Sequence, residues 1–251
     1  MPAAGPAASA ENRLSGKPHP GQQQLRDNAM RIIAGRHRGT KLAQLVGADT
    51  RPTADRVRES LFNILEGGRF GQILADAIVI DAFAGTGALG LEALSRGARS
   101  ARFVERDMKA LSVLRANIDR LKCAGDCQVV AGDATSIAAW QGPPATLMFA
   151  DAPYGSGSGF AAAQGIARVG GLAPGALVIV ETDKSEQPPE EDVAASGMTV
   201  LESRRYGRAN LHFLEFSAGR RGNACQTAFR HRPVKVLSMS AVHGCTAPSS
   251  A

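Results

Sequence analysis

The sequence predicts an α/β fold in which a mostly parallel β-sheet is covered by helices on both faces. Short apolar runs alternate with segments of helical periodicity, which is the pattern of repeated strand–helix units. The apolar runs contain almost no polar residues, as expected for strands that are buried on both faces. The 251 residues include 28 glycines and only 5% aromatic residues, which fits many tight strand–helix turns better than an all-β sandwich.

The expected elements follow one another regularly from residue 30 to residue 217. The alternating stretch 30–35 reads as a strand. Thr53 caps a helix that presents Val57, Leu61 and Leu65 along one face until two glycines end it. Further helices are expected at 89–96 and 108–121. Buried strands are expected at 77–80, 101–104, 127–130, 146–150 and 176–180, and two closing strands at 198–201 and 211–216, which gives a sheet of seven strands.

The two ends of the chain differ from this middle part. Residues 1–29 are rich in Ala, Pro, Gly, Gln and Ser, and we expect a disordered extension with Met30 as the functional start. Residues 218–251 contain five Lys or Arg and no acid, and we expect a disordered basic tail. No apolar run approaches the ~18 residues of a membrane span. No secretion signal precedes the fold, so we expect a cytoplasmic protein without a membrane partner.

Metal binding is not expected. Of the four cysteines, Cys123 and Cys127 are close in sequence, but no second pair has ligand spacing and no histidine lies nearby. Free thiols are therefore the better interpretation.

Ligands of parallel sheets bind beyond the carboxyl ends of the strands, so the residues that follow each strand are candidates for a site. The first strand runs into a glycine-rich turn, 81–90, that lets the backbone approach a ligand closely. This pattern also fits a dinucleotide site. However, the carboxylate of Asp81 would repel a pyrophosphate, whereas it suits the cationic, amino-bearing end of S-adenosylmethionine.

The next two strand ends extend the same interpretation. Glu105 is placed to accept both ribose hydroxyls of an adenosine. Asp133 is placed to accept the adenine amino group, and Ala134 leaves room for the ring. The predicted cofactor-binding residues are Asp81, Phe83, Gly85, Thr86, Gly87, Glu105, Arg106, Asp133 and Ala134.

The fourth strand ends in the predicted catalytic residues Asp151, Ala152, Pro153 and Tyr154. An exocyclic amino group of a base is a poor nucleophile because its lone pair is delocalised into the ring. The Asp151 carboxylate and the Ala152 carbonyl can each accept one N–H and so orient that lone pair. Pro153 stiffens the turn, and Tyr154 offers a ring on which the base can stack.

These features resemble the amino-methyltransferases of the class I fold. More narrowly, 30–35 with Arg38-Gly39, the block 51–63, and Tyr206-Gly207 followed by 211–213 resemble the RsmD family over about residues 30–216. The resemblance implies a Rossmann-like class I methyltransferase fold, S-adenosylmethionine as cofactor, and methylation of guanine N2 in 16S rRNA of the small subunit. The family has proline where this chain has Ala152; alanine keeps the carbonyl, so we expect activity.

The part before the sheet is expected to face RNA. Between Arg31 and Arg58 the chain carries seven Lys or Arg and two acids. Such charges hold phosphates without reading sequence. We expect a basic hairpin and helix at 30–66, ahead of a cofactor and catalytic core at 77–217, with Arg58 exposed. The predicted RNA-binding residues are Arg36, His37, Arg38, Lys41, Arg51, Thr53, Arg56 and Arg58.

Several alternatives stay open at this point. Adenine-N6 methylation of DNA or RNA uses the same tetrapeptide chemistry, although the block 51–63 disfavours it. A noncatalytic RNA-binding protein with this fold is supported only by Ala152. An NAD-dependent oxidoreductase lacks a recognisable catalytic pair. We expect a monomer, and the sequence leaves open whether its substrate is free 16S rRNA or an assembled 30S subunit.

Overall fold

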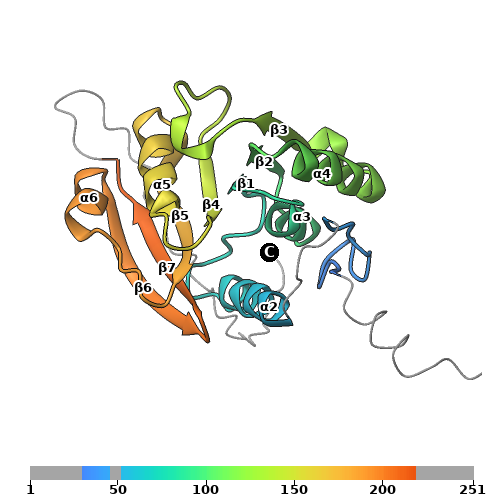
Figure 1. The fold of residues 1–251 in the computed structure, drawn as a ribbon, viewed down its shortest axis with the longest axis horizontal. Coiled ribbons are helices and arrows are strands. Elements are labelled where there is room, and N and C mark those ends of the chain that lie inside the picture. Colours follow the sequence, from blue (N-terminus) through green and yellow to red (C-terminus); the bar gives the residue numbers. More distant parts are fainter. Residues whose placement is uncertain (1–29, 46–51, 219–251) are drawn as a thin grey trace, which may run out of the picture. The chain divides into compact units, whose positions relative to one another are not determined.

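The computed structural model of the chain describes residues 30–45 and 52–218. The expectations for 1–29 and for 219–251 lie outside these residues. One sheet has the order β3-β2-β1-β4-β5-β7-β6 (Figure 1). Its strands are β1 (Ile78–Ala82), β2 (Ser100–Glu105), β3 (Cys127–Ala131), β4 (Ala145–Asp151), β5 (Leu172–Asp183), β6 (Met198–Tyr206) and β7 (Ala209–Phe216).

The strand directions confirm the predicted fold class. Strands β1 to β5 are parallel, and β7 runs antiparallel to both β5 and β6. The carboxyl ends of β1, β2, β3 and β4 therefore meet at one edge of the sheet, which we call the catalytic edge. The opposite edge, where these strands begin, we call the amino edge.

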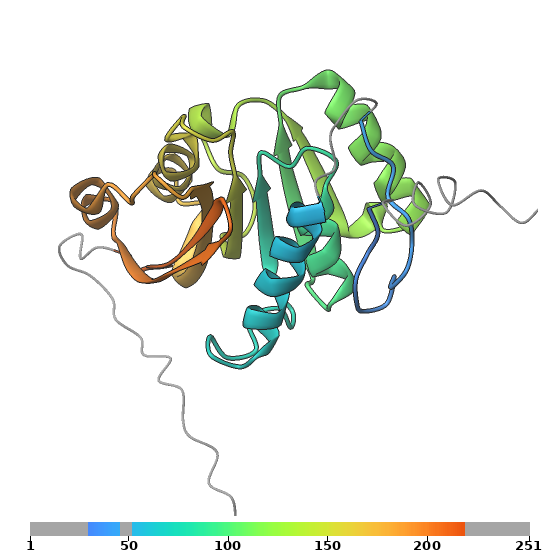
Figure 2. The same cartoon turned by 60° about the horizontal axis from the view of Figure 1, so that its bottom comes forward.

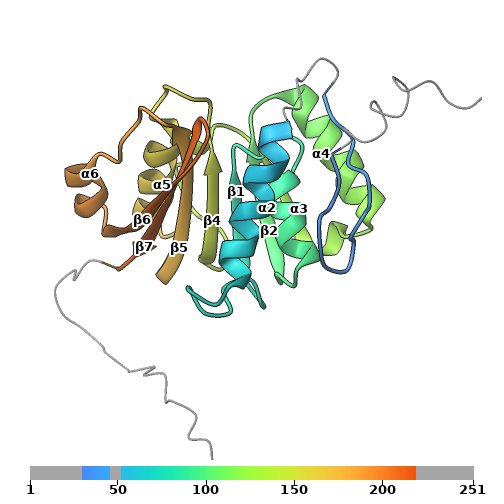
Figure 3. The same ribbon diagram turned by 90° about the horizontal axis from the view of Figure 1, so that it is seen from below.

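Helices cover both faces of the sheet (Figures 2 and 3). One hydrophobic core contains apolar side chains from α2 (Pro52–Glu66), α3 (Ala88–Ser95) and α4 (Met108–Leu121). The other contains side chains from α5 (Ser158–Arg168) and α6 (Glu190–Ala195). Two short 3-10 turns, η1 (Ala124–Asp126) and η2 (Ala134–Ser136), flank β3. None of the helices formed by the described residues has the length and apolarity needed to cross a membrane.

Helices α5 and α6 and the first part of β5 have no counterpart among the expected elements. Helix α5 packs through small residues, and a Cβ atom at Gly159 would lie 2.7 Å from a Val180 methyl group. Glycine and alanine weaken the apolar periodicity by which a helix is recognised. Strand β5 begins at Leu172, before Pro174-Gly175, a pair that ordinarily indicates a turn.

The predicted strand at 30–35 is too long. Only its start is paired: Arg31 forms an antiparallel bridge with Lys41, and backbone hydrogen bonds join Ile32 to Thr40 and Gly39 and Met30 to Leu42. The expected hairpin is therefore present, but short, in a segment that lies beside α3 and α4 (Figure 3). We call residues 30–45 the N-terminal segment. Beyond this hairpin pairing, the amides of Ile33, Ala34 and His37 are bonded by side chains of α3.

Candidate active site

A cavity of about 420 Å³ opens at the catalytic edge. It is lined from four strand ends, as the rule for parallel sheets requires. The lining includes most of the predicted catalytic and cofactor-binding residues, but Asp81, Gly85, Thr86 and Gly87 are not part of it. The lining residues are Phe83, Val104, Glu105, Arg106, Gly132, Asp133, Ala134, Asp151, Ala152, Pro153 and Tyr154.

The glycine turn between β1 and α3 is held from two sides. Glu105 Oε2 accepts a hydrogen bond from the Gly85 amide (2.8 Å), and Asp81 Oδ2 accepts one from the Gly90 amide (2.8 Å). Gly87 has a φ of 86°, and a Cβ atom there would lie 2.4 Å from Leu114 Cδ1. Both the backbone angle and the space therefore require glycine at this position.

Asp81 lies behind the turn, not in the cavity wall. Its side chain is 1% exposed. Burial, with a smaller contribution from the Glu105 charge, raises the pKa of Asp81 to about 7, although the Gly90 amide opposes this shift. The sequence leads us to expect that the Asp81 carboxylate faces the cofactor. In the structure this carboxylate instead accepts a hydrogen bond from the Gly90 amide of the loop.

Glu105 and Asp133 lie where the sequence places them. Glu105 Oε1 also accepts hydrogen bonds from the amides of Arg106 (2.8 Å) and Asp107 (2.7 Å). Asp133 Oδ1 accepts from the amide (2.9 Å) and the hydroxyl (2.7 Å) of Thr135, and Arg106 lies 3.3 Å from its other oxygen. These contacts, the Thr135 amide first, lower the pKa of Asp133. Both carboxylates are held in the cavity lining by the protein's own hydrogen-bond donors.

The tetrapeptide after β4 forms the other side of the cavity. Asp151 is exposed to the cavity, Ala152 is buried, and the Tyr154 side chain is 42% exposed. Protein atoms surround Asp151 on its other sides; this loss of hydration, followed by the negative charges of Glu181 and Asp81, raises its pKa to about 8.

Sequence reasoning did not find Glu181. It is the register partner of Asp151 on the neighbouring strand β5, and its Oε1 accepts a hydrogen bond from Tyr154 Oη (2.7 Å). A signal was present, because Glu181 directly follows the strand expected at 176–180. Glu186 accepts from the Gly155 amide (2.6 Å), and no sequence pattern indicates that contact.

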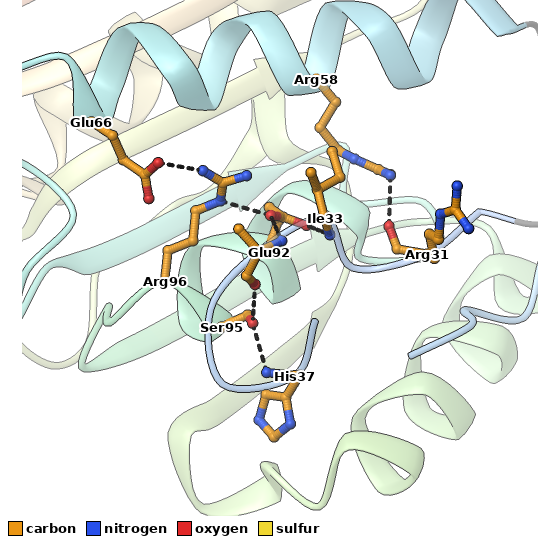
Figure 4. Close-up of polar contacts among 9 residues, drawn as sticks. Arg31, Ile33, His37, Arg58, Glu66, Glu92, Ser95 and Arg96 are labelled. Atoms are coloured by element: carbon orange, nitrogen blue, oxygen red, sulfur yellow. Dashed lines mark hydrogen bonds and ion pairs between the residues drawn. The ribbon is translucent and has the colours of Figure 1, made fainter. Parts of the chain in front are cut away.

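The N-terminal segment is anchored on α3 through Glu92 and Ser95 (Figure 4). The Glu92 carboxylate accepts hydrogen bonds from the amides of Ile33 (2.7 Å) and Ala34 (3.0 Å) and from Arg96 Nε (2.7 Å). Arg96 also pairs with Glu66 of α2 (2.7 Å). The side chains of Glu92 and Arg96 are almost completely buried, so this ion pair ties the segment to two helices.

The tip of the segment is fixed at the C-terminal end of α3. Ser95 Oγ donates to the Ala34 carbonyl (2.5 Å) and accepts from the His37 amide (3.0 Å). At Gly35 the φ is 79°, and a Cβ atom would lie 1.8 Å from the Ser95 carbonyl oxygen. Arg36 pairs with Asp126 (2.8 Å) just before β3 begins. The tip therefore lies at the amino edge, away from the cavity.

The predicted RNA-binding residues consequently do not form one group. Arg36, Arg38 and Lys41 are exposed on the segment, His37 is half-buried, and Arg56 is exposed on α2. Burial, followed by the Arg36 charge, lowers the pKa of His37. Arg51 lies outside the described residues, as does the side chain of Thr53.

The expectation that Arg58 is exposed is wrong. Its side chain is 6% exposed, donates to the Arg31 carbonyl (2.9 Å) and pairs with Asp55 (3.2 Å), as Figure 4 shows for the first contact. The N-terminal segment covers a helix face that the sequence pattern alone assigns to solvent. Arg58 thus holds the segment to α2.

A single side-chain amide joins the segment to the glycine turn. Asn117 of α4 is completely buried. Its Oδ1 accepts from the Ala43 amide (2.7 Å), and its Nδ2 donates to the carbonyls of Ala43 (3.1 Å) and Thr86 (3.0 Å). The segment and the turn are therefore positioned by the same group.

Cys123 and Cys127 lie beside η1 as free thiols, with their Sγ atoms 3.7 Å apart.

Comparison with known proteins adds independent findings. The model of the family described as Conserved hypothetical protein 95 matches residues 30–215. Ribosomal RNA small subunit methyltransferase D of Escherichia coli K12 is 42% identical over 154 residues, which cover 61% of this chain and 75% of that protein. The Haemophilus influenzae protein of the same name is 36% identical over 160 residues, 62% of this chain and 80% of its own.

Solved structures agree with these sequence relatives. The Escherichia coli protein yhhF, described as a candidate methyltransferase, superposes with a TM-score of 0.64 at 36% identity and covers 75% of this chain and 98% of its own. The Haemophilus influenzae protein HI0767, a candidate methylase, gives a TM-score of 0.60 at 30% identity, with 75% and 99% covered.

Proposed function

This chain belongs to the family described as Conserved hypothetical protein 95, and from that premise we propose that it methylates the exocyclic N2 of a guanine in 16S rRNA, with S-adenosylmethionine as methyl donor. The chain is an rRNA methyltransferase, as its relatives of the same family are named. The observation that carries the finer proposal is the cavity that brings the tetrapeptide 151–154 together with Glu105 and Asp133.

The residues around the cavity fit the proposed cofactor. We assign the ribose to Glu105, whose carboxylate already accepts three backbone amides and so has room for about one hydroxyl group, and the adenine ring to Asp133 with Ala134. Asp151 faces the cavity with a raised pKa, and no Lys or Arg of the described ranges forms an ion pair with it. Such a carboxylate is stabilised by a positively charged ligand. When bound, the cofactor supplies a methyl group on a cationic sulfonium.

The protein's own groups orient the nucleophile. The Asp151 carboxylate and the Ala152 carbonyl accept the two N–H groups of the guanine amine, so that its lone pair points toward the methyl group. The Tyr154 ring receives the base by stacking. The proton lost by the amine goes to Asp151 or to water. Positioning and charge complementarity supply most of the rate, as in other preorganised sites.

Basic residues outside the cavity support RNA as the substrate. The exposed Arg36, Arg38 and Lys41 are suited to phosphates, and we assign them that role together with Arg56. Extruding a guanine from a structured RNA costs a few kcal/mol, which these contacts help to offset. We further propose that the enzyme acts as a monomer in the cytoplasm.

One experiment tests the proposal. The purified protein is incubated with labelled S-adenosylmethionine and with naked 16S rRNA, assembled 30S particles or DNA, and the labelled nucleoside is then identified. We expect N2-methylguanosine in one of the two ribosomal arms, and the arm that is labelled decides the form of the substrate. Label in adenine, label only in DNA, or no label would overturn the proposed function.

A further inference from the structure

Tyr154 owes its position to a carboxylate on the neighbouring strand. Its ring is substantially exposed at the cavity, but its hydroxyl group donates to Glu181 Oε1 at 2.7 Å. Within the described part of the chain, Tyr154 is the hydrogen-bond partner of the Glu181 side chain. Glu181 itself stands on β5, in register with Asp151 on β4, so it belongs to the rigid sheet.

The loop that carries Tyr154 has little apolar anchorage of its own. Residues 153–157 are exposed, and Gly155 and Gly157 both have positive φ. The backbone is tied by Glu186 to the Gly155 amide and by a hydrogen bond from Ser156 Oγ to the Pro153 carbonyl. These ties fix the main chain, whereas the contact with Glu181 fixes the direction of the Tyr154 side chain.

We infer that Glu181 is a positioning residue for methyl transfer, which holds the Tyr154 ring in the orientation that receives the target base and places a second negative charge beside Asp151. This inference rests on the proposed function, because it assumes that a base stacks on Tyr154. A ring held in place before binding loses less rotational freedom when the base arrives. RNA should therefore bind more tightly to the enzyme with both Tyr154 and Glu181 than to a variant that lacks either member of the pair.

The charge of Glu181 affects the ionisation of Asp151, which is a separate effect from the orientation of the Tyr154 ring. The carboxyl groups that face Asp151 come from β1 (Asp81) and β5 (Glu181), and both disfavour its ionised form. Ionised Asp151 is the form that accepts an N–H of the amine. Removing the Glu181 charge therefore moves the acidic limb of the pH–rate profile to lower pH, while the limb persists because burial and Asp81 remain.

Four variants separate the two roles: Tyr154→Phe, Glu181→Ala, Glu181→Gln and the double variant Tyr154→Phe/Glu181→Ala. The substrate is whichever ribosomal RNA, naked or in 30S particles, accepts label from the unmodified enzyme. Loss of one hydrogen bond is expected to raise the KM for RNA by about 3–10-fold in each of the first two variants. The double variant should be no worse than the worse single variant, because both remove the same contact.

Glu181→Gln provides the matched control. Its amide oxygen still accepts from Tyr154, so the KM for RNA should stay within about twofold of the original. Its pH–rate limb should move to lower pH together with that of Glu181→Ala. The affinity for S-adenosylmethionine, measured by calorimetry, should change little in all variants, and thermal melting identifies any variant that fails to fold.

The outcomes distinguish this inference from the function beneath it. Additive KM effects in the double variant, or an unshifted pH limb in Glu181→Gln, would overturn the role of Glu181 while methylation by the original enzyme stands. If the original enzyme labels no ribosomal guanine, the proposed function itself fails.

Discussion

Two groups of buried or enclosed carboxylates in this molecule differ in how completely they are paired with positive charges. Where the N-terminal segment contacts α3, the Glu92 carboxylate accepts hydrogen bonds from two backbone N–H groups and from the guanidinium of Arg96. At the catalytic edge, Asp81, Asp151 and Glu181 crowd together, and within 30–45 and 52–218 they form no ion pair with Lys or Arg. Complete pairing fixes the fold, whereas incomplete pairing leaves a site that a cationic ligand can satisfy.

Breaking the paired group should have the largest effect. Glu92→Ala removes the acceptor of two backbone amides and leaves the buried Arg96, among the described residues, with Glu66 as its ion-pair partner and the Phe62 ring as its other contact. We expect a loss of about 3–5 kcal/mol in the free energy of unfolding, the usual cost of breaking a buried pair, measured by urea denaturation. Glu66→Ala is the control: Glu66 is about half exposed, and its removal should cost about 1 kcal/mol or less. Equal effects would contradict the distinction.

Removing a member of the unpaired group should affect rate and leave the fold intact. Asp151→Ala is expected to lower kcat by roughly 10²–10³, as for the loss of one preorganised polar contact, in single-turnover assays with saturating cofactor and RNA. The melting temperature should not fall. Near-normal turnover would show that Asp151 does not orient the amine.

The raised pKa of Asp151 predicts the direction in which the stability of the fold changes with pH. The pKa of Asp151 is raised from 3.8 to about 8 in the folded protein, so the folded state holds a proton over a range in which the unfolded state has lost it. Ionising Asp151 therefore destabilises the fold progressively from about pH 4 to pH 8. Asp151→Asn should gain stability relative to the original chain as the pH rises through that range, with no further gain above it. Chemical denaturation at several pH values measures this difference, and a constant or falling difference would refute the assigned shift.

The mildest effect is expected at the tip of the N-terminal segment. Arg36→Ala/Arg38→Ala removes two exposed cations, so the slope of log affinity for RNA against log salt concentration should become shallower by about 1.5–2. Cofactor affinity should not change. Arg168→Ala, an exposed cation on α5 across the sheet, is the control and should leave the slope unaltered. If the double variant behaves like Arg168→Ala, the tip does not contact RNA.

Much of the site could be predicted from sequence, because it depends on local patterns. Glu105, Asp133 and Asp151 each follow a strand that its apolar run makes recognisable, and parallel strand ends meet at one edge. The burial of Arg58 could not be predicted, because the N-terminal segment that covers it lies 27 residues away in sequence at Arg31. The partnership of Tyr154 with Glu181 likewise depends on strand order.

The same limit explains why the strand expected at 30–35 is too long. Alternating side chains indicate an extended backbone, and the backbone here is indeed not helical. Met30 and Ile32 bond the backbone of residues 39–42, but the partners of Ile33 and Ala34 are side chains of Glu92 and Ser95, more than 50 residues farther along. No local pattern identifies such partners.

The position of the Arg36 tip also determines the distance between the tip of the N-terminal segment and the cavity. The tip is attached at the amino edge and the cavity opens at the catalytic edge, and the strands between them, such as β1, have five residues. At about 3.3 Å per residue this separation is roughly 17 Å. Since Glu92 and Ser95 hold the segment in place, the spacing is built into the folded chain. An RNA that reaches the cavity and the tip together must therefore have a footprint at least that long across the side of the domain formed by α3 and α4, and a mononucleotide can occupy only one end of it.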